Sequence, residues 1–494
     1  MITEAAAPSG DKYRISRLDT LVGVAIFSVN LVLRILTVGR AGLSLDEAAS
    51  VWFCGQDWPA FVEFLGRDAT PPLFSLMLRG WTSLFGISEV VVRLPSVIAT
   101  SVTAAVVYFF GTRWMGRRMG LLAAMIFSLS PLQMEMSQTA RVYSIAACFA
   151  AISMYFFVGF LRDGGRRWAV GLVLADLAIV YSNYAAGLLL VARCVALPFF
   201  GPRGWRRLPA FFALQVLVLF AFIPGLVRID ANQVSEPGRW FDSPGVGSLW
   251  SLWSAVCGNQ ALAVCFAAIL VGGIVAAGQG RRKVAPRILG SFAAWLSWGV
   301  GSIAVAWIVS QWIPLFVPRY LAYAGAGVAL SVAGALTLMT TGRHWGLAWV
   351  GAAVVLSLSV TAFRPSAPVI EDWPAAAEWI ENHRRSDTKI IVSAGYQCRT
   401  LIYALNRDLF LQYQTPHRVW FDREGLVCVN TVDEEILASL ETDHLLLVQS
   451  HARDVDPENT TAKVIEHTYR QMEQHELPGI TLGAYDRVRM VPCP

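Results

Sequence analysis

Long apolar stretches recur along the first 363 residues of the chain, and short polar segments separate them. A bilayer core of roughly 30 Å requires about 18 or more apolar residues from a helix that spans it. The pattern therefore predicts a mostly α, polytopic helical bundle with about eleven spans. Their expected bounds are 18–38, 89–111, 119–136, 142–161, 168–183, 185–200, 209–227, 249–278, 288–311, 320–341 and 345–363.

Basic residues return in every second connection between the predicted spans. Loops rich in Lys and Arg stay on the cytoplasmic side of a membrane. The alternation predicts a cytoplasmic N-terminus, with segment 39–89 and the C-terminal residues on the outer, periplasmic side of the membrane. No small-residue cleavage site follows the first span, so we expect it to remain as an anchor. The basic clusters are Lys12/Arg14/Arg17, Arg113/Arg117/Arg118, Arg162/Arg166/Arg167, Arg203/Arg206/Arg207, Arg281/Arg282/Lys283/Arg287 and Arg343.

Hydropathy falls after Pro365, and the remaining chain has the pattern of a small α/β domain. Helical periodicity begins after Asp372, a favourable N-cap residue, and short apolar runs predict buried strands. We expect a membrane domain over 1–363, which includes the first periplasmic loop 39–89, and a soluble periplasmic domain over 364–494. The expected elements of the soluble domain are helices 373–383 and 399–406, strands 389–393 and 444–449, and an edge strand within 480–491.

Composition agrees with this division, since 55% of the 494 residues are hydrophobic and 15% are charged. A soluble enzyme of this length is far more polar, so that class is excluded. The formal net charge of +5 follows from the basic loops, and no nucleic-acid partner is expected. Cys398, Cys428 and Cys493 fall in the predicted periplasmic domain, where any two of them can form a disulfide.

Two of the predicted periplasmic segments are longer than a connection needs. In the first, Pro71 to Phe85 is apolar on one helical face and carries Arg79 on the other, which predicts a helix in the membrane interface. The second, 229–248, is rich in Pro, Gly, Asn and Ser and predicts a flexible loop. A pocket at the depth of the lipid headgroups is expected beside the interfacial helix.

An acidic pair, Asp46 and Glu47, follows Ser44 just after the first span. Ser44 and Glu47 have the spacing of a capping box, which explains the motif as the start of a helix. The second interpretation is that Asp46 is a carboxylate held at the headgroup boundary, where it acts as a general base. The two interpretations are compatible, because a cap fixes the direction of the neighbouring side chain.

Five motifs occur in order along the chain: Ser44–Glu47 (SLDE), Asp68–Leu73 (DATPPL), Arg93–Ser96 (RLPS), Ser137–Ser144 (SQTARVYS) and Pro318–Leu321 (PRYL). As a set they resemble the GT-C fold glycosyltransferases, in particular the bacterial protein O-mannosyltransferase-like and rhizobial galacturonosyltransferase-like branch. The C-terminal domain carries none of these motifs.

This resemblance implies a hexosyl- or pentosyltransferase that takes a sugar from a polyprenyl-phosphate donor. The acceptor is a lipid, a glycan or a protein of the cell envelope. The family's catalytic base corresponds to Asp46, which would deprotonate the acceptor as it attacks the anomeric carbon and inverts its configuration. Glu47 is carried over as a second catalytic-site residue that steers the acceptor or Asp46.

A leaving phosphate needs fixed positive charge, and the arginine side chain can donate two parallel hydrogen bonds to it. Arg141 and Arg319 lie at the predicted outer ends of spans, at the depth of a lipid phosphate. Tyr143 and Tyr320 follow them closely and can bond the same group. The alternative is that the arginines extend to ordinary headgroups and the tyrosines belong to the aromatic belt.

The chain departs from the family pattern at Thr70, Thr139 and Asn183, where a metal ligand or titrating group is common. The departures weaken the case for a bound divalent metal. Glu135 or Asp68 would have to replace the missing ligands if a metal is used. Gln138, in the motif of Arg141, is a further candidate for the substrate site.

Asp176 and Arg193 are charges within the predicted fifth and sixth spans. The two spans join by a tight turn, so both residues should lie at a similar depth. We expect a structural ion pair.

Two other functions compete with glycosyl transfer. A transporter or flippase of lipid-linked saccharides would also need many spans and outer-face arginines, but it should show two symmetric halves with broken helices, and the sequence shows no such symmetry. A scaffold that binds a partner through the soluble domain would leave the motif set unexplained.

Overall fold

A computed structural model describes residues 15–68, 70–228, 243–279, 286–313, 315–340, 345–366, 368–412 and 425–488. The chain folds into two compact units. The helical unit comprises Met1–Thr37, Leu65–Met77 and Arg93–Ser366, and the sheet unit comprises Val38–Phe64, Leu78–Val92 and Ala367–Pro494. The domain bounds 1–363 and 364–494 stay a prediction; the two compact units differ from them in grouping parts of loop 39–89 with the C-terminal residues.

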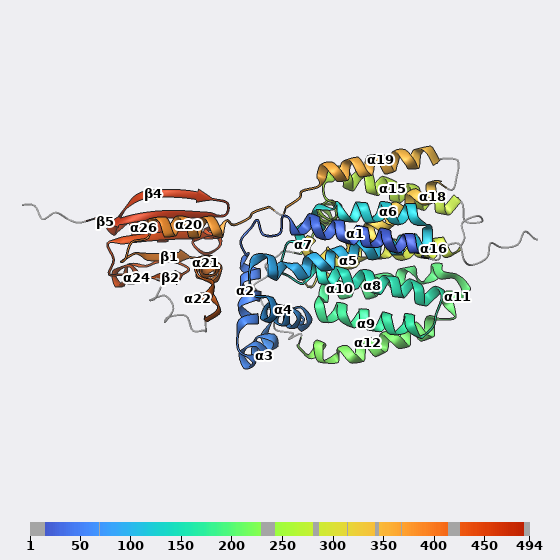
Figure 1. Cartoon of the computed structure of the whole chain (residues 1–494), viewed down its shortest axis with the longest axis horizontal. Coiled ribbons are helices and arrows are strands. Elements are labelled where there is room, and N and C mark those ends of the chain that lie inside the picture. Colours follow the sequence, from blue (N-terminus) through green and yellow to red (C-terminus); the bar gives the residue numbers. More distant parts are fainter. Residues whose placement is uncertain are drawn as a thin grey trace, which may run out of the picture. The chain divides into compact units, whose positions relative to one another are not determined.

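The helical unit is built almost entirely from α-helices (Figure 1). Short 3-10 or π turns (η) interrupt or precede several of them. The elements are α1 (Arg17–Ile35), α5 (Glu89–Met115), α6 (Arg117–Ser128), α7 (Pro131–Ser137), α8 (Tyr143–Arg162), α9 (Arg166–Ser182), α10 (Tyr184–Ala192), η1 (Arg193–Phe200), α11 (Gly201–Trp205), α12 (Leu208–Arg228), α14 (Val246–Cys257), α15 (Gln260–Gln279), α16 (Pro286–Leu296), η2 (Ser297–Gly301), α17 (Ser302–Val309), η3 (Pro318–Leu321), α18 (Ala324–Thr340) and α19 (Trp345–Ala362).

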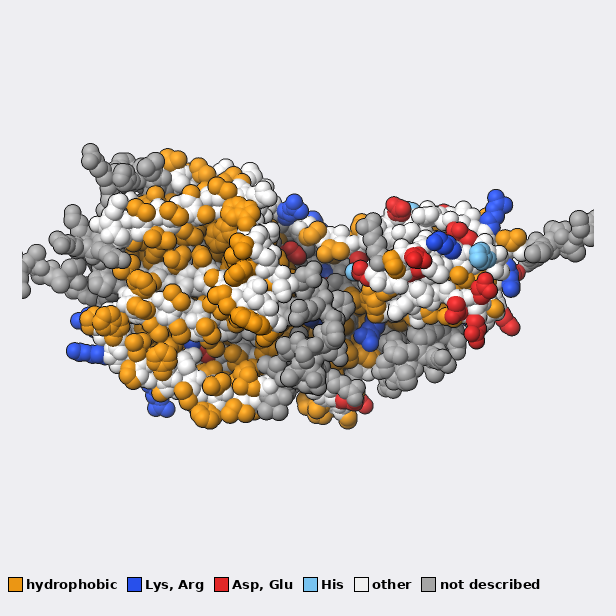
Figure 2. Space-filling model, turned by 180° about the vertical axis from the view of Figure 1, so that it is seen from behind, with side chains coloured by type: hydrophobic (Ala, Val, Ile, Leu, Met, Phe, Trp, Pro, Cys, Tyr) orange, Lys and Arg blue, Asp and Glu red, His pale blue; other side chains and the backbone are white. Residues whose placement is uncertain are grey.

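Within the described residues, seven helices are long and apolar enough to cross a membrane, or eight if the bent pair α6–α7 forms one span. These eight coincide with predicted spans. The other three predicted spans correspond to α9, α18 and α19, which have 17, 17 and 18 residues. The chain is thus a multi-pass membrane protein, and Figure 2 shows hydrophobic side chains over the surface of its helical unit.

Two predicted spans contain a break that the apolar pattern did not reveal. Predicted span 119–136 bends by 64° between α6 and α7, where Pro131 begins the second helix. Predicted span 249–278 is interrupted between α14 and α15 at Gly258, whose φ of +113° favours glycine. A Cβ atom at Gly258 would also lie 2.8 Å from Cδ of Pro131, so the two breaks pack against each other.

Helix α18 is the most deeply buried helix of this unit, and it consists mainly of small residues. It packs against α6, α15 and α16. Close approach depends on glycine: a Cβ atom at Gly327 would lie 2.5 Å from the backbone nitrogen of Gly299. Small residues allow membrane helices to pack backbone against backbone, where water provides no hydrophobic driving force.

The predicted ion pair between Asp176 and Arg193 is confirmed. Two hydrogen bonds join the side chains, Nη2 to Oδ2 at 2.6 Å and Nη1 to Oδ1 at 2.9 Å, and both side chains are fully buried. Ser153 and Gln215 also donate to the carboxylate, at 2.6 and 3.2 Å. The carboxylate therefore has four donors, which favours a structural role.

Replacing Asp176 with Ala should leave Arg193 as an uncompensated buried charge and lower the free energy of unfolding by about 3 to 5 kcal/mol. The double variant Asp176→Leu/Arg193→Leu should recover most of this loss. Thermal unfolding of detergent-solubilised protein measures both. A single variant as stable as the wild type would contradict the structural role.

The sheet unit contains a five-stranded sheet in the order β2-β1-β3-β5-β4 (Figure 1). β1 runs parallel to β2 and β3, whereas β5 is antiparallel to β3 and β4. Its elements are α2 (Leu45–Gly55), α3 (Trp58–Arg67), α4 (Pro72–Phe85), α20 (Trp373–His383), β1 (Lys389–Ser393), η4 (Gly395–Gln397), α21 (Cys398–Leu405), α22 (Arg407–Gln412), β2 (Leu426–Val429), α24 (Glu434–Ser439), β3 (His444–Ser450), α25 (Ala452–Val455), α26 (Thr460–Thr468), β4 (Tyr469–Leu477) and β5 (Ile480–Arg487); the boundary between the two units falls within α3 and α4.

Helices cover both faces of the sheet, as expected for parallel strands that are apolar throughout. Leu447 of β3 packs with Ile465 of α26 in a buried cluster on one face. α20 packs with α21 and β5. The strand expected within 480–491 is confirmed as β5. Its expected place at the edge of the sheet is wrong, because β5 is internal and β4, with charged and exposed residues, forms the edge.

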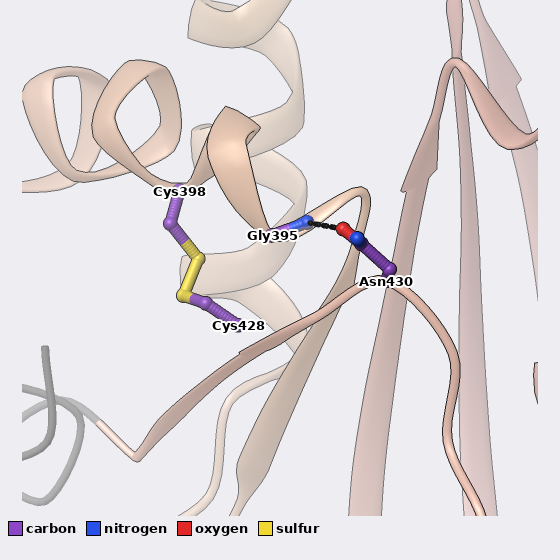
Figure 3. The surroundings of a disulfide bond; sticks show 4 residues. All are labelled: Gly395, Cys398, Cys428 and Asn430. Carbon is purple, nitrogen blue, oxygen red and sulfur yellow. Dashed lines mark hydrogen bonds between the residues drawn. A yellow bond between two sulfur atoms is a disulfide. The ribbon is translucent and has the colours of Figure 1, made fainter. Parts of the chain in front are cut away.

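A disulfide joins Cys398, the first residue of α21, to Cys428 of β2 (Figure 3). Beside it, the Gly395 N–H donates to Oδ1 of Asn430 at 3.3 Å. The third candidate, Cys493, lies outside the described residues, as do residues 229–242 of the expected loop and the basic residues 281–283 and 343. The bond closes a loop between residues 30 apart in sequence.

Removing this disulfide should destabilise the sheet unit by about 3 to 4 kcal/mol, because the unfolded chain regains the entropy of an open loop. A reductant should lower the unfolding temperature of the wild type. The Cys398→Ala/Cys428→Ala variant should start at the lower value and show no further change with reductant. An identical shift in both proteins would mean that the reductant acts elsewhere.

Candidate active site

The acidic motif lies at the start of α2 in the sheet unit. Oε2 of Glu47 accepts hydrogen bonds from the Ser44 N–H at 2.9 Å and from the Ser44 hydroxyl at 3.2 Å. Glu47 is buried and Asp46 is half-buried. Glu47 therefore completes the capping box with Ser44. This cap fixes the first turn of α2, the helix that carries Asp46.

Arg79, which belongs to none of the five motifs, holds the other end of α2. Its Nη1 donates to the backbone oxygens of Cys54 and Gln56, at 3.0 and 2.6 Å. The guanidinium also lies 4.7 Å from the ring centre of Phe61. A cation on the last carbonyls of a helix stabilises its C-terminus. Burial raises the pKa of the Cys54 thiol to about 12, although Arg79 opposes this shift, so the thiol stays protonated.

The C-terminal part of the sheet unit packs against α2. The Arg399 guanidinium of α21 lies 4.6 Å from the Trp52 ring centre, and the Tyr403 hydroxyl donates to the Ile87 carbonyl at 2.8 Å. Arg407 forms an ion pair with Glu89. A small cavity of about 90 Å³ lies between these segments and is lined in part by Gly42, Leu43 and Trp373. The C-terminal residues of the sheet unit therefore help to position the acidic loop.

Replacing Glu47 tests whether it positions Asp46 or takes part in chemistry. Glu47→Gln keeps a carbonyl oxygen for the Ser44 N–H, so we expect nearly wild-type turnover. Glu47→Ala removes the cap, at a cost of about 1 kcal/mol, and should lower kcat with little change in KM. Rates that fall equally in both variants would instead assign the carboxylate itself a catalytic role.

In the helical unit, the arginine candidates lie on the turn between α7 and α8 and on η3. The ring centres of Tyr143 and Tyr320 are 5.9 Å apart, and the Arg319 guanidinium lies 5.6 Å from the Tyr320 ring centre. Arg319 is also close enough to Glu135 for an electrostatic interaction. The structure thus brings together a group of candidates that the sequence separates by about 180 positions.

Two contacts hold this group in place. Nε2 of Gln133, a residue that no motif singled out, donates to the Ala322 carbonyl just after η3 at 2.8 Å. The Ser96 hydroxyl of α5 donates to the Arg141 carbonyl at 3.4 Å. These bonds connect α7, α5 and η3 and fix the backbone that carries Arg141 and Arg319.

The other candidates make local hydrogen bonds. Nε2 of Gln138 donates to the Thr37 hydroxyl at 2.6 Å and to the Pro365 carbonyl at 3.2 Å, so it ties the end of α1 to the end of α19. Asp68 accepts hydrogen bonds from the Thr70 N–H, at 3.2 Å, and from the Thr70 hydroxyl. These contacts favour a structural role for Gln138 and Asp68.

The three departures from the family pattern also have local roles. Oδ1 of Asn183 caps α10 by accepting the N–H of Ala185 at 2.8 Å. The Thr139 hydroxyl donates to the Glu135 carbonyl at 2.9 Å. In the described part of the chain, no three His, Cys, Asp or Glu side chains gather as metal ligands.

The bundle and its attached sheet domain together define the GT-C glycosyltransferase fold. Residues 69–227 match the family described as dolichyl-phosphate-mannose-protein mannosyltransferase. The crystal structure of ArnT from Cupriavidus metallidurans bound to undecaprenyl phosphate is similar, with a TM-score of 0.60 and 15% identity over 94% of this chain and 98% of that one. The apo oligosaccharyltransferase of Archaeoglobus fulgidus gives a TM-score of 0.50 and 12% identity over 97% of this chain and 75% of that one. A search of curated protein sequences finds no match.

These similarities confirm the resemblance to GT-C glycosyltransferases that the five motifs indicated. Neither the family match nor the similar structures support the transporter alternative. Asp46 and Glu47 belong to the sheet unit, and the arginine and tyrosine candidates belong to the helical unit.

Proposed function

We propose that this protein is an inverting glycosyltransferase of the bacterial inner membrane that moves a hexose or pentose from a polyprenyl-phosphate donor to an envelope acceptor at the periplasmic face. The observation that carries the proposal is the cluster of Arg319, Tyr143 and Tyr320, with Arg141 on the turn just before α8. It supplies fixed positive charge and hydroxyl donors to a phosphate. The fold shared with ArnT, whose structure holds undecaprenyl phosphate, supports this choice of donor.

In the proposed reaction, Asp46 accepts the proton of the acceptor hydroxyl. The acceptor oxygen forms a bond to the anomeric carbon while the bond between that carbon and the phosphate oxygen breaks. The electron pair of the broken bond leaves with the polyprenyl phosphate, whose new negative charge Arg141 and Arg319 stabilise. Because there is one displacement, the configuration at the anomeric carbon inverts.

Glu47 acts through Asp46 as a positioning residue, since its cap fixes the first turn of α2. The Arg399 and Tyr403 contacts hold the same loop from the soluble domain. We assign Glu135 the role of orienting Arg319, because an acid beside a guanidinium limits its rotamers.

The test is transfer by purified protein from extracted polyprenyl-phosphate sugars to extracted envelope lipids and glycans. We expect free polyprenyl phosphate and a glycosylated product whose anomeric configuration, determined by NMR, is opposite to that of the donor. Retention of configuration would contradict a single displacement. Movement of intact donor across vesicle membranes, with no bond broken, would favour the transporter.

A further inference from the structure

A polar groove of about 660 Å³ lies in the sheet unit. Gln449 of β3, Gln474 of β4 and Thr481 of β5 line it. Gln449 pairs with Thr481 across the two strands, so their side chains emerge on the same face of the sheet. Leu447, two residues before Gln449, packs under α26 on that face. The groove therefore lies on the same face of the sheet as α26.

The loop between β3 and α26 forms the wall of the groove. His451 and Asn459 both have φ of +54°, in the left-handed region where His and Asn are enriched among residues that carry a side chain. Nε2 of Gln449 donates to Oδ1 of Asn459 at 2.8 Å. Burial opposes ionisation of Asp456, but the N–H groups of Thr461 and Thr460 outweigh it and lower the pKa of this carboxyl group.

A hydrogen bond with Glu371 fixes the side chain of His451. Oε1 of Glu371 lies 2.7 Å from Nε2 of His451 and accepts from the Ser450 hydroxyl at 3.0 Å. Oε2 of Glu371 accepts from Trp373 at 2.8 Å, and the side chain is 8% exposed. The groove is therefore preorganised, and little conformational entropy would be lost on binding.

The chemistry of the lining selects the class of ligand. Amide, hydroxyl and carboxylate groups provide both donors and acceptors, whereas both ring nitrogens of His451 already lie within hydrogen-bond distance of Glu371 and Asp454. Of the nine described residues that line the groove, none is a lysine or arginine and only Pro457 is a purely apolar side chain. A phosphate would need arginine or lysine, and a lipid or an apolar peptide anchor would need hydrophobic side chains.

An aromatic ring, that of Tyr396, lies beside His451 of the groove lining. Tyr396 is 42% exposed, and its ring centre is 6.3 Å from that of His451. Burial, with the nearby charges of Asp454 and Glu371, raises the pKa of Tyr396. The phenol thus stays a hydrogen-bond donor, and its ring offers an apolar face to a ligand.

We propose that this groove is a saccharide-binding site that holds an uncharged part of the glycan acceptor. Hydroxyl groups of sugars match the donors and acceptors of the floor and wall, and the apolar face of one sugar ring fits against Tyr396. The volume suits a ligand of a few sugar rings. Binding is a property of the groove alone, whereas its identity as the acceptor site rests on the proposed function.

The test measures binding of maltotriose and chitotriose to full-length protein in nanodiscs by isothermal titration calorimetry. Asp454→Asn removes a carboxylate from the wall and should weaken binding about tenfold. Gln474→Leu removes an amide from the floor and should weaken it about fivefold. Asp387→Asn makes the same Asp-to-Asn change at an exposed residue just before β1. This residue lies at the end of the parallel strands β1 and β3 opposite to the groove, and the variant should bind as tightly as the wild type.

No binding of either sugar at about 10 mM, or equal binding by all four proteins, would overturn the proposal. Displacement of the sugar by a Gly/Ser hexapeptide would assign the groove to peptides instead. Asp46→Asn protein should bind both sugars normally. Full turnover by that variant would contradict the proposed base but leave the groove intact, so the two failures can be told apart.

Discussion

Asp46→Asn protein is expected to transfer sugar about 10² to 10⁴ times more slowly than the wild type, with the effect in kcat. An amide cannot take the proton that the acceptor hydroxyl loses as it attacks. The helix start should survive, because Ser44 and Glu47 form the cap. Initial rates at several donor concentrations, with circular dichroism to check folding, measure the change.

Asp57→Asn is the matched control for this substitution. Oδ1 of Asp57 accepts the N–H of Ala60 at 2.9 Å at the start of α3, and asparagine caps a helix as well as aspartate does. The control removes one negative charge near α2 without removing a proton acceptor from the proposed site, and it should keep wild-type rates. Equal turnover by Asp46→Asn and the wild type would eliminate the assignment of Asp46 as the base. Equal losses in Asp46→Asn and Asp57→Asn would mean that turnover depends on the negative charge of the loop and not on a base at Asp46.

The buried elements of the soluble domain were predictable because their sequences carry strong local signals. Strand 389–393 and helix 373–383 have the predicted bounds, and Asp372 caps that helix by accepting the N–H of Ala375 at 3.2 Å. A short apolar run that is rich in β-branched residues, such as KIIVS, favours a buried strand over a buried helix segment. β2 and β4 were not predicted, because β2 has four residues and β4 is an exposed edge strand with polar and charged side chains.

In the membrane domain, the apolar pattern gave the positions of the spans and not their breaks. Hydropathy is the same on both sides of Gly258, so only the positive φ of that residue reveals the end of α14. The bend before Pro131 was hidden for a similar reason. A proline in the first turn of a new helix and a proline inside a continuous helix give the same apolar pattern in the sequence.

Long-range partners of the candidate site could not be predicted for a different reason. Arg407 and Glu89 are 318 positions apart in the sequence. Arg399 and Trp52, which are also in contact, have a comparable separation in the sequence. Each of these residues alone is an ordinary helix residue. The residue types of the site followed from the chemistry of a leaving phosphate, whereas the contacts that hold the site depend on the tertiary fold.

Arg319→Ala is expected to lower kcat/KM for the donor by about 10² to 10³-fold. The phosphate gains negative charge as the sugar leaves, so an arginine beside it stabilises the transition state more than the bound donor. Arg319→Lys should recover part of the loss, because an ammonium keeps the charge but not the two parallel hydrogen bonds. The same series at Arg141 should show whether the two guanidinium groups share the phosphate.

Arg364→Ala is the control for the alternative that these arginines anchor the protein at lipid headgroups. Arg364 is exposed and follows α19. If Arg319 only anchors, both variants should lose membrane insertion or thermal stability to a similar degree and keep the KM of the wild type. If Arg319 binds the phosphate, its replacement should also weaken binding of free polyprenyl phosphate, whereas Arg364→Ala should not. A normal dissociation constant for polyprenyl phosphate in Arg319→Ala would therefore contradict phosphate binding by Arg319, because the product carries the full charge that the side chain is proposed to neutralise.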